Sequence, residues 1–458
     1  MKHRFPRFRK RSAARQRGVA FIVAIVLVLI IGSLLLVFAR QMQTEAVASS
    51  NHRSAVQARL IAEGMARALL VELDQPQDEI DIDADGAVLG DGLYWIVRID
   101  HDDDRQHTFG VTSEAGKVNL NTAPADTLRL LPNMDETIAA AIVDWRDADH
   151  DPIEHGAESE YYLARRPTYV AKNAPFETVD ELRLVRDVDR ALFDGEDWNR
   201  NGVLDASEND AGRRNPPDNA DGRLERGLRP YVTIHSREPN VSRVTGRPRL
   251  NINEAEEDEL EQALSSLLTE EQIAALMGRI DNQRPYANMI AFFAAAQLDE
   301  LLDGETGPLL DRLTTSDAEM LPGRIDAAAA PAAVFEALPE LEPGDGDALL
   351  AARASAGAPR QSWQWVIEAL GEEKAIAVGD RLTLRSFQFA ADIVAISGDG
   401  RAFHRLRVVV DLAGAAPRLV HAADWTSLGW PLDPAIRDAL RGGATPREVA
   451  LRYGSGQS

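Results

Sequence analysis

The sequence contains no cysteine, so no disulfide bond can stabilise any part of the 458-residue chain. It also lacks the GxSxG, HExxH and phosphate-loop motifs, and its nine histidines show neither metal-site nor catalytic-triad spacing. These absences argue against hydrolases, zinc proteases and nucleotide-hydrolysing enzymes, and we expect no catalysis. Because 45% of the residues are hydrophobic, a chain of this length still predicts more than one packed core.

Positive charge is scarce: the chain has 50 Lys and Arg residues but 73 Asp and Glu residues, which gives a net charge of −23. Eight of the basic residues precede Gly18, which leaves the rest of the chain at about −31. Proteins bind nucleic acids by neutralising phosphates with Lys and Arg. We therefore expect no nucleic-acid partner.

One long apolar run interrupts this charged sequence. Residues 19–39 are uncharged, and a helix of this length crosses the roughly 30 Å of bilayer hydrocarbon. The eight basic residues before the run predict a cytoplasmic amino terminus, with the rest of the chain on the other side of the membrane. The run continues into Arg40 without the small-x-small cleavage site of a secretory signal peptide. The sequence therefore predicts a single-pass membrane protein.

The boundary Arg17-Gly18 in front of this run resembles the class III signal of type IV prepilins and type II secretion pseudopilins. The resemblance implies that prepilin peptidase cuts after Gly18, which makes Val19 the first mature residue. Most members of that family carry Glu at the fifth mature position, a filament contact, where this chain has Val23. A carboxylate in hydrocarbon must be paired, so a subunit without it needs no preceding partner. The alternative for this segment alone is a plain single-pass anchor.

The remaining sequence predicts an α+β fold in which a large helical insertion splits a pseudopilin α/β domain. Helical spacing of apolar residues continues the anchor into a stem, and strand patterns flank the insertion. We expect a basic leader, a transmembrane and stem helix, the first part of the α/β domain, the insertion, a closing β-hairpin and a tail. In that order, these segments span residues 1–18, 19–73, 74–115, 116–384, 385–413 and 414–458.

The predicted insertion contains a repeated pattern. The segment Asn119-Leu120-Asn121 is echoed by Asn251-Ile252-Asn253 and, more faintly, by Ile325-Asp326. Three copies of one helical unit are expected, with the polar side chains capping helices. Similar helix-hairpin-helix units bind the DNA backbone. Here Asp135 and Glu340 lie where phosphate would bind, so the pattern favours a structural role.

A twelve-residue stretch that begins at Asp197 matches a calcium loop. It has oxygen-bearing side chains at positions one, three, five, nine and twelve and a glycine at position six. Hard oxygen ligands crowd together where a cation offsets their repulsion. The alternative is an ordinary acidic loop. The predicted ligands are Asp197, Asn199, Asn201, Val203 through its carbonyl, Asp205 and Glu208.

A second acidic loop repeats part of this pattern. Pro152 replaces the glycine and His155 stands at position nine, so a solvated loop is the alternative. The predicted ligands here are Asp147, Asp149, Asp151, Ile153 and Glu158.

The leader, the split domain, the Asn-x-Asn unit and the segments 141–149, 156–162 and 175–182 together resemble the protein K family of type II secretion. The resemblance covers about 17–412. It implies an inner-membrane minor pseudopilin with a periplasmic body at the pseudopilus tip, which joins minor pseudopilins I and J, starts assembly and holds structural calcium. The alternative is a membrane-anchored, calcium-dependent binding or hydrolytic protein.

Overall fold

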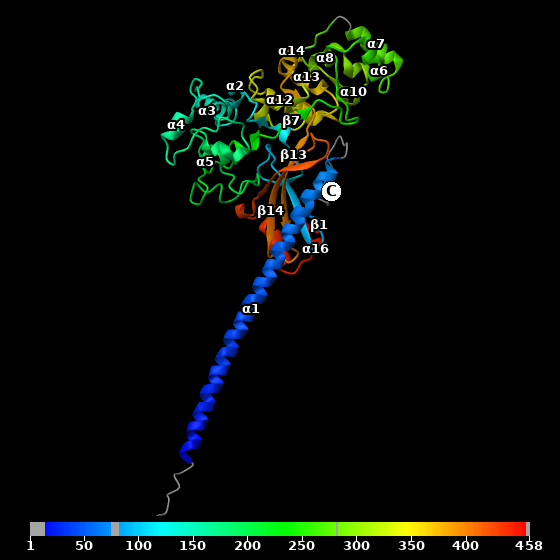
Figure 1. Ribbon diagram of the computed structural model, residues 1–458. Helices are drawn as coiled ribbons and strands as arrows, with labels where there is room; N and C mark the ends of the chain where they lie inside the picture. The colour runs from blue at the N-terminus through cyan, green and yellow to red at the C-terminus, as the bar shows by residue number, and fades with distance from the viewer. Residues whose placement is uncertain (1–13, 75–81, 281–282, 455–458) are drawn as a thin grey trace, which may run out of the picture.

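A computed structural model describes residues 14–74, 82–280 and 283–454. One long helix, α1 (Ala14–Glu72), leads into a body made of a β-sheet and many short helices (Figure 1). This arrangement confirms the predicted fold class. Residues 1–13 of the expected leader lie outside the described residues, while Gly18 and Val19 are part of α1.

The two halves of α1 have different surroundings. From residue 19 to residue 49 every side chain is exposed, including Val23 at 56%. Farther along, Ala62, Met65 and Leu69 are buried against Ile393 of the sheet. Within the described residues, α1 is the helix that is long and apolar enough to cross a membrane. The amino-terminal half of α1 is therefore long and apolar enough to cross a membrane, while apolar residues at helical spacing in the other half pack on the sheet.

The sheet is antiparallel and combines strands from both ends of the chain. Its main order is β1-β2-β13-β14-β15, while β3 pairs with β2 and β4 pairs with β13. Ile393 lies opposite Ile96 on one side and Leu406 on the other. The strands are β1 (Ala87–Leu89), β2 (Gly92–Arg98), β3 (Thr108–Phe109), β4 (Thr112–Ser113), β13 (Gln388–Ile396), β14 (Phe403–Asp411) and β15 (Arg418–Asp424).

The segment expected as a tail is built into this sheet. β15 pairs with β14, so the sheet continues beyond the hairpin expected to close it. The helices α15 (Pro434–Arg441) and α16 (Pro446–Tyr453) then cover the face opposite α1. On that face Trp95 meets Trp430 edge to face, with 6.0 Å between ring centroids. Both faces of the sheet are therefore covered within one chain.

Three similar units form the insertion, and each is closed by a short parallel strand pair. In each pair an Asn or Asp lies opposite a Thr: Asn119 and Thr233, Asn251 and Thr314, Asp326 and Thr383. The pairs are β5 (Val118–Asn119) with β6 (Val232–Thr233), β8 (Leu250–Asn251) with β9 (Leu313–Thr314), and β11 (Ile325–Asp326) with β12 (Leu382–Thr383). A further pair, β7 (Arg237–Pro239) with β10 (Met320–Pro322), is antiparallel.

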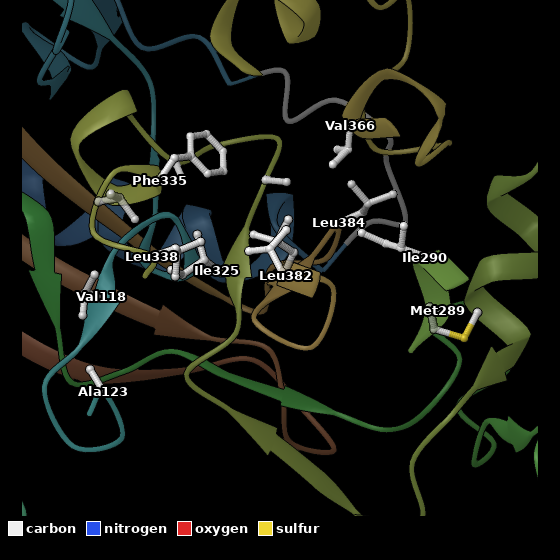
Figure 2. Packing of buried hydrophobic residues seen from close by; sticks show 14 of the residues in the cluster. Val118, Ala123, Met289, Ile290, Ile325, Phe335, Leu338, Val366, Leu382 and Leu384 are labelled. Carbon is white, nitrogen blue, oxygen red and sulfur yellow. The ribbon is translucent and has the colours of Figure 1, made fainter. Parts of the chain in front are cut away.

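The helices of these units are short and share one core. They are α2 (Ala125–Leu128), α3 (Glu136–Arg146), α4 (Ser159–Leu163), α5 (Arg190–Asp194), α6 (Glu257–Leu264), α7 (Glu270–Ile280), α8 (Met289–Ala295), α9 (Leu298–Leu301), α10 (Gly307–Arg312), α11 (Ala332–Phe335), α12 (Asp345–Ser355), α13 (Gln364–Leu370) and α14 (Glu372–Val378). Figure 2 shows Val118, Ile290, Ile325 and Leu382, which come from all three units, within one buried cluster.

The second Asn of the repeat has a structural role in the first two units. Asn121 donates to the Phe176 carbonyl at 3.0 Å and accepts from the Phe176 N–H at 2.7 Å. Asn253 makes the same pair with Tyr286, at 3.0 and 2.8 Å. The third unit has Ala328 at this place. The two Asn side chains therefore tie the start of a unit to a later loop of the same unit, which satisfies buried backbone groups.

Candidate functional site

The loop 197–208 follows α5, and several of its polar residues are buried despite the charge of the loop. Asp197, Asn201 and Glu208 expose only 3%, 2% and 2% of their surface. Gly202 sits at φ +75°, and a Cβ there would approach Ile99 at 3.2 Å. A glycine at position six is therefore required both by the backbone turn and by the close approach to the sheet domain.

Backbone N–H groups orient the loop carboxylates. Asp197 accepts hydrogen bonds from the N–H groups of Asn201 at 3.0 Å and Gly202 at 2.9 Å. Glu208 accepts from Trp198 and Asp205, both at 3.0 Å. The first and last predicted ligands are thus fixed by the loop that they close.

The remaining predicted ligands lie in the same network. The side-chain amide of Asn199 donates to Asp205 at 2.7 Å, and Asn201 accepts from the Val203 N–H at 2.8 Å. The structure thus links the five side chains that sequence spacing selected in one hydrogen-bonded network, with Val203 adjoining them. Among the described residues their carboxylates do not form a close group like that of the second loop. All of them offer the hard oxygen atoms that calcium prefers.

The electrostatics of the loop also suit a cation. Burial and then the nearby charges of Asp197 and Asp205 raise the pKa of Glu208 to about 8. Burial likewise raises the pKa of Asp197. Burial disfavours the charged form of both carboxylates, and a divalent ion would stabilise that form. Asp197, Asn199, Asn201, Asp205 and Glu208 are the residues that would hold such an ion.

The second loop brings together part of its predicted set. Ligand oxygens of Asp147, Asp149 and Glu158 lie within 4.8 Å of one another, which is close enough to share a metal ion. Asp151 and Ile153 are exposed and lie outside this group. Proline in place of the glycine at position six gives this loop a course different from that of the first.

Buried oxygens in this group lack hydrogen-bond donors among the described residues. They are Oδ1 of Asp147 and Oε1 of Glu158, with Oδ1 of Asn173 beside them. Burial, then the charges of Asp149 and Glu158, raise the pKa of Asp147. Carboxylate oxygens left without donors in a buried place fit a cation.

Two residues of this region were missed by sequence reasoning. The amide of Asn173 donates to Glu158 at 3.4 Å, although it lies 15 residues farther along the chain. Asp144 accepts from the Ile153 N–H at 3.2 Å, and burial raises its pKa to about 6. Gly156 is the one sequence feature that relates to Asp144. A glycine is needed there because a Cβ at residue 156 would collide with the Asp144 carboxylate. No sequence signal marks Asn173.

The second loop also lies within a stretch that matches a known family. The family model of type II secretion system protein K matches residues 117–195. This stretch contains the loop 147–158 and ends just before the loop 197–208.

Three proteins K of the type II secretion system resemble the chain over short stretches. The protein from Klebsiella pneumoniae is 40% identical over 75 residues, which is 16% of this chain and 21% of that protein. The protein from Pectobacterium carotovorum is 35% identical over 91 residues, which is 18% of this chain and 27% of that protein. The protein from Pseudomonas aeruginosa is 39% identical over 61 residues, which is 13% of this chain and 18% of that protein. The chain therefore spans about a fifth to a quarter of the length of the curated relatives it matches.

A chain in the crystal structure of a GspK-GspI-GspJ complex from enterotoxigenic Escherichia coli is also similar. The comparison has a TM-score of 0.36 at 14% identity, over 83% of this chain and 99% of that one. The sequence comparisons bear out the predicted resemblance. Residues 117–195 are therefore similar to a domain of type II secretion system protein K.

Proposed function

We propose that the chain is a minor pseudopilin at the tip of the type II secretion pseudopilus, where it starts assembly and supports protein export. The observation that carries this proposal is the apolar half of α1, which projects from the body with every side chain from residue 19 to residue 49 exposed. Val23 stands where the resemblance implies a filament contact. A pseudopilin without a carboxylate there needs no preceding subunit, which suits the first position in a filament.

The shape of the body also supports a terminal position. The sheet domain and the three-unit insertion sit at one end of α1, and the insertion spreads sideways from it (Figure 1). A shaft grows by packing stem helices side by side, and a bulky body fits that packing better at the end than within. The match to protein K over 117–195 adds independent support. We infer that minor pseudopilins I and J are the partners and that α1 crosses the inner membrane with its amino terminus in the cytoplasm.

Structural calcium is part of this proposal. Both loops offer oxygen ligands with raised carboxyl pKa values, and the exported side of the membrane can hold calcium at concentrations that fill even weak sites. The ion would supply positive charge that holds each loop closed, and we propose no reaction at either site.

Mass spectrometry of the mature amino terminus tests the pseudopilin assignment. The full chain is expressed with and without prepilin peptidase. A chain that begins at Val19 only when the peptidase is present supports the proposal. An intact leader in both cases rejects it and favours the alternative, a membrane-anchored calcium-dependent protein.

Co-purification and imaging test the tip position. Wild type is expected to co-purify with minor pseudopilins I and J, and to remain functional without a carboxylate at residue 23. The matched pair is Val23→Glu and Val23→Ala. A requirement for glutamate at this position, or labelled protein found along the whole filament, would contradict a tip subunit.

A further inference from the structure

A cavity of about 980 Å³ lies where the three-unit insertion meets the sheet domain. Phe109 and the following Gly110–Ser113 stretch form one side, together with Phe389 of β13. The other walls come from all three repeat units. None of the ligands predicted for the two acidic loops lines the cavity.

The repeat places a cation at the same position of each unit. Lys117, Arg249 and Arg324 each come directly before the first strand of a unit, and all three line the cavity. The three strand starts therefore converge on one space. Internal repetition of the sequence thus concentrates positive charge there.

The charge of the cavity is opposite to that of the chain. Eight Lys and Arg side chains line it against four Asp and Glu side chains, although the whole chain carries a net charge of −23. Such a local reversal of sign creates a field that attracts anionic groups.

Only part of this positive charge is paired within the chain. Lys117 pairs with Glu114 at 2.7 Å, whereas Arg249 and Arg385 both approach the same Glu238 oxygen at 3.2 Å. In contrast, Arg98, Arg243 and Arg324 form no ion pair with any residue that the structure describes. Glu238 thus pairs with two guanidinium groups, one of which, Arg385, also pairs with Asp311 at 3.4 Å. Arg353 likewise forms no ion pair within the described residues, so four of the eight cations are without one.

The positively charged guanidinium groups in the cavity also repel one another. Burial, then the charges of Arg385 and Arg360, lower the pKa of Arg243. Burial and Arg385 lower the pKa of Arg249 to about 10, and its buried Nε has no hydrogen-bond partner. An anion in the cavity would offset this repulsion and accept hydrogen bonds.

The walls indicate which kind of anion fits. Val111, Trp363 and Leu384 contribute apolar surface between the arginines. Guanidinium groups bind carboxylates through two parallel hydrogen bonds, while apolar side chains of the same ligand can occupy the apolar wall. A phosphate would use the arginines alone and leave most of the space empty.

We propose that this cavity binds an acidic polypeptide segment of a partner protein, with Arg243 and Arg324 as carboxylate-binding side chains. A segment that alternates acidic and apolar residues matches both wall types. The site is independent of leader processing, so failure of one proposal leaves the other intact.

Binding of a labelled peptide to the detergent-solubilised full chain tests this inference. The probe is a fluorescent ten-residue peptide of alternating Glu and Leu, followed by anisotropy, with a Lys-Leu peptide as the charge control. We expect saturable binding of the Glu-Leu peptide that weakens with salt, and no binding of the Lys-Leu peptide. Absence of Glu-Leu binding, or equal binding of both peptides, overturns the proposal.

Two kinds of variant locate the site. The double variant Arg243→Gln with Arg324→Gln is expected to weaken binding at least tenfold. Arg213→Gln, at an exposed residue that does not line the cavity, should leave binding unchanged. Ala358→Glu adds a negative charge at the exposed rim without removing a contact, and it should weaken binding relative to Ala358→Gln. Equal affinity of Ala358→Glu and Ala358→Gln overturns the assignment, and so does full displacement by millimolar inorganic phosphate.

Discussion

The side-chain amide of Asn201 donates a hydrogen bond of 2.9 Å to the carbonyl oxygen of Pro431. This bond links the first acidic loop to the carboxyl-terminal segment, 230 residues farther along the chain. From the sheet, Arg405 of β14 donates to the Arg200 carbonyl at 2.8 Å and to Asp392 at 2.9 Å. The loop, the sheet and the carboxyl-terminal segment therefore meet at one place, and a cation in the loop would stabilise all three.

Calcium is expected to raise the unfolding temperature of the full chain. A ligand at 100 times its dissociation constant adds about 2.7 kcal/mol to the free energy of unfolding. Glu208→Gln should remove most of the gain from the first loop because it removes a predicted ligand. Differential scanning calorimetry with calcium or with chelator measures this effect.

The paired control for that experiment is Glu158→Gln, which changes only the second loop. Limited proteolysis adds a local measurement, since chelation should speed cleavage of wild type near 414–433. Identical melting of wild type with calcium and with chelator would contradict a structural metal.

Replacement of Arg405 is expected to be strongly destabilising. Its side chain is fully buried and pairs with Asp392, which is also buried. Removing one member of such a pair leaves an unpaired buried charge, at a cost of about 3–5 kcal/mol. Urea unfolding of Arg405→Met tests this expectation, with the exposed Arg401→Met as the control. Equal midpoints for the two variants would show that the buried pair contributes little.

The carboxyl-terminal helices are expected to be part of the stable fold. Leu440 is 2% exposed in the core on the sheet face opposite α1. Leu440→Ala should lower the free energy of unfolding by about 2–5 kcal/mol through the cavity that it leaves. Val244→Ala, at a side chain 74% exposed, should have little effect. Wild-type stability of Leu440→Ala would mean that these helices are not needed for the fold.

Acid pH should weaken the junction between the insertion and the sheet. Glu114 is buried, which raises its pKa, but Lys117 and Arg407 outweigh burial and hold that pKa at about 2. A carboxyl group with a lowered pKa contributes stability above its unfolded value near 4.5, and this contribution is lost as the pH falls toward 2.

Glu114→Gln tests this contribution. At pH 7 the variant is expected to be less stable than wild type by roughly 2–3 kcal/mol, because Lys117 and Arg407 lose their anion. The difference should shrink between pH 4.5 and pH 2, as measured by unfolding midpoints across that range. A difference that does not change with pH would argue against an ionised Glu114 in the fold.

Features with a local physical cause could be predicted from the sequence. The apolar run and helical spacing predict α1, because both depend on residues three and four apart. The turn before β14 follows from Asp399-Gly400, where Gly400 has φ +64°. The loop 197–208 is likewise local, since its predicted ligands and the N–H groups that orient them lie within twelve residues.

Contacts between distant segments could not be predicted in this way. Asn173 reaches Glu158 because two loops of the first unit pack together, and no spacing rule relates them. The sequence of β15 predicts a tail and not a strand, because an edge strand with mixed exposure lacks clear alternation of apolar and polar residues.

Local sequence patterns by themselves determined the membrane-length helix, the repeated units and the spacing of oxygen-bearing side chains in the first acidic loop. Only the tertiary structure decided that Lys117, Arg249 and Arg324 share one cavity and that Arg405 binds the first acidic loop. The reason is that helical and strand periods, and the hydrogen bonds within a loop, relate residues that are only a few positions apart in the sequence. The convergence of charges far apart in the chain depends on how all the units pack.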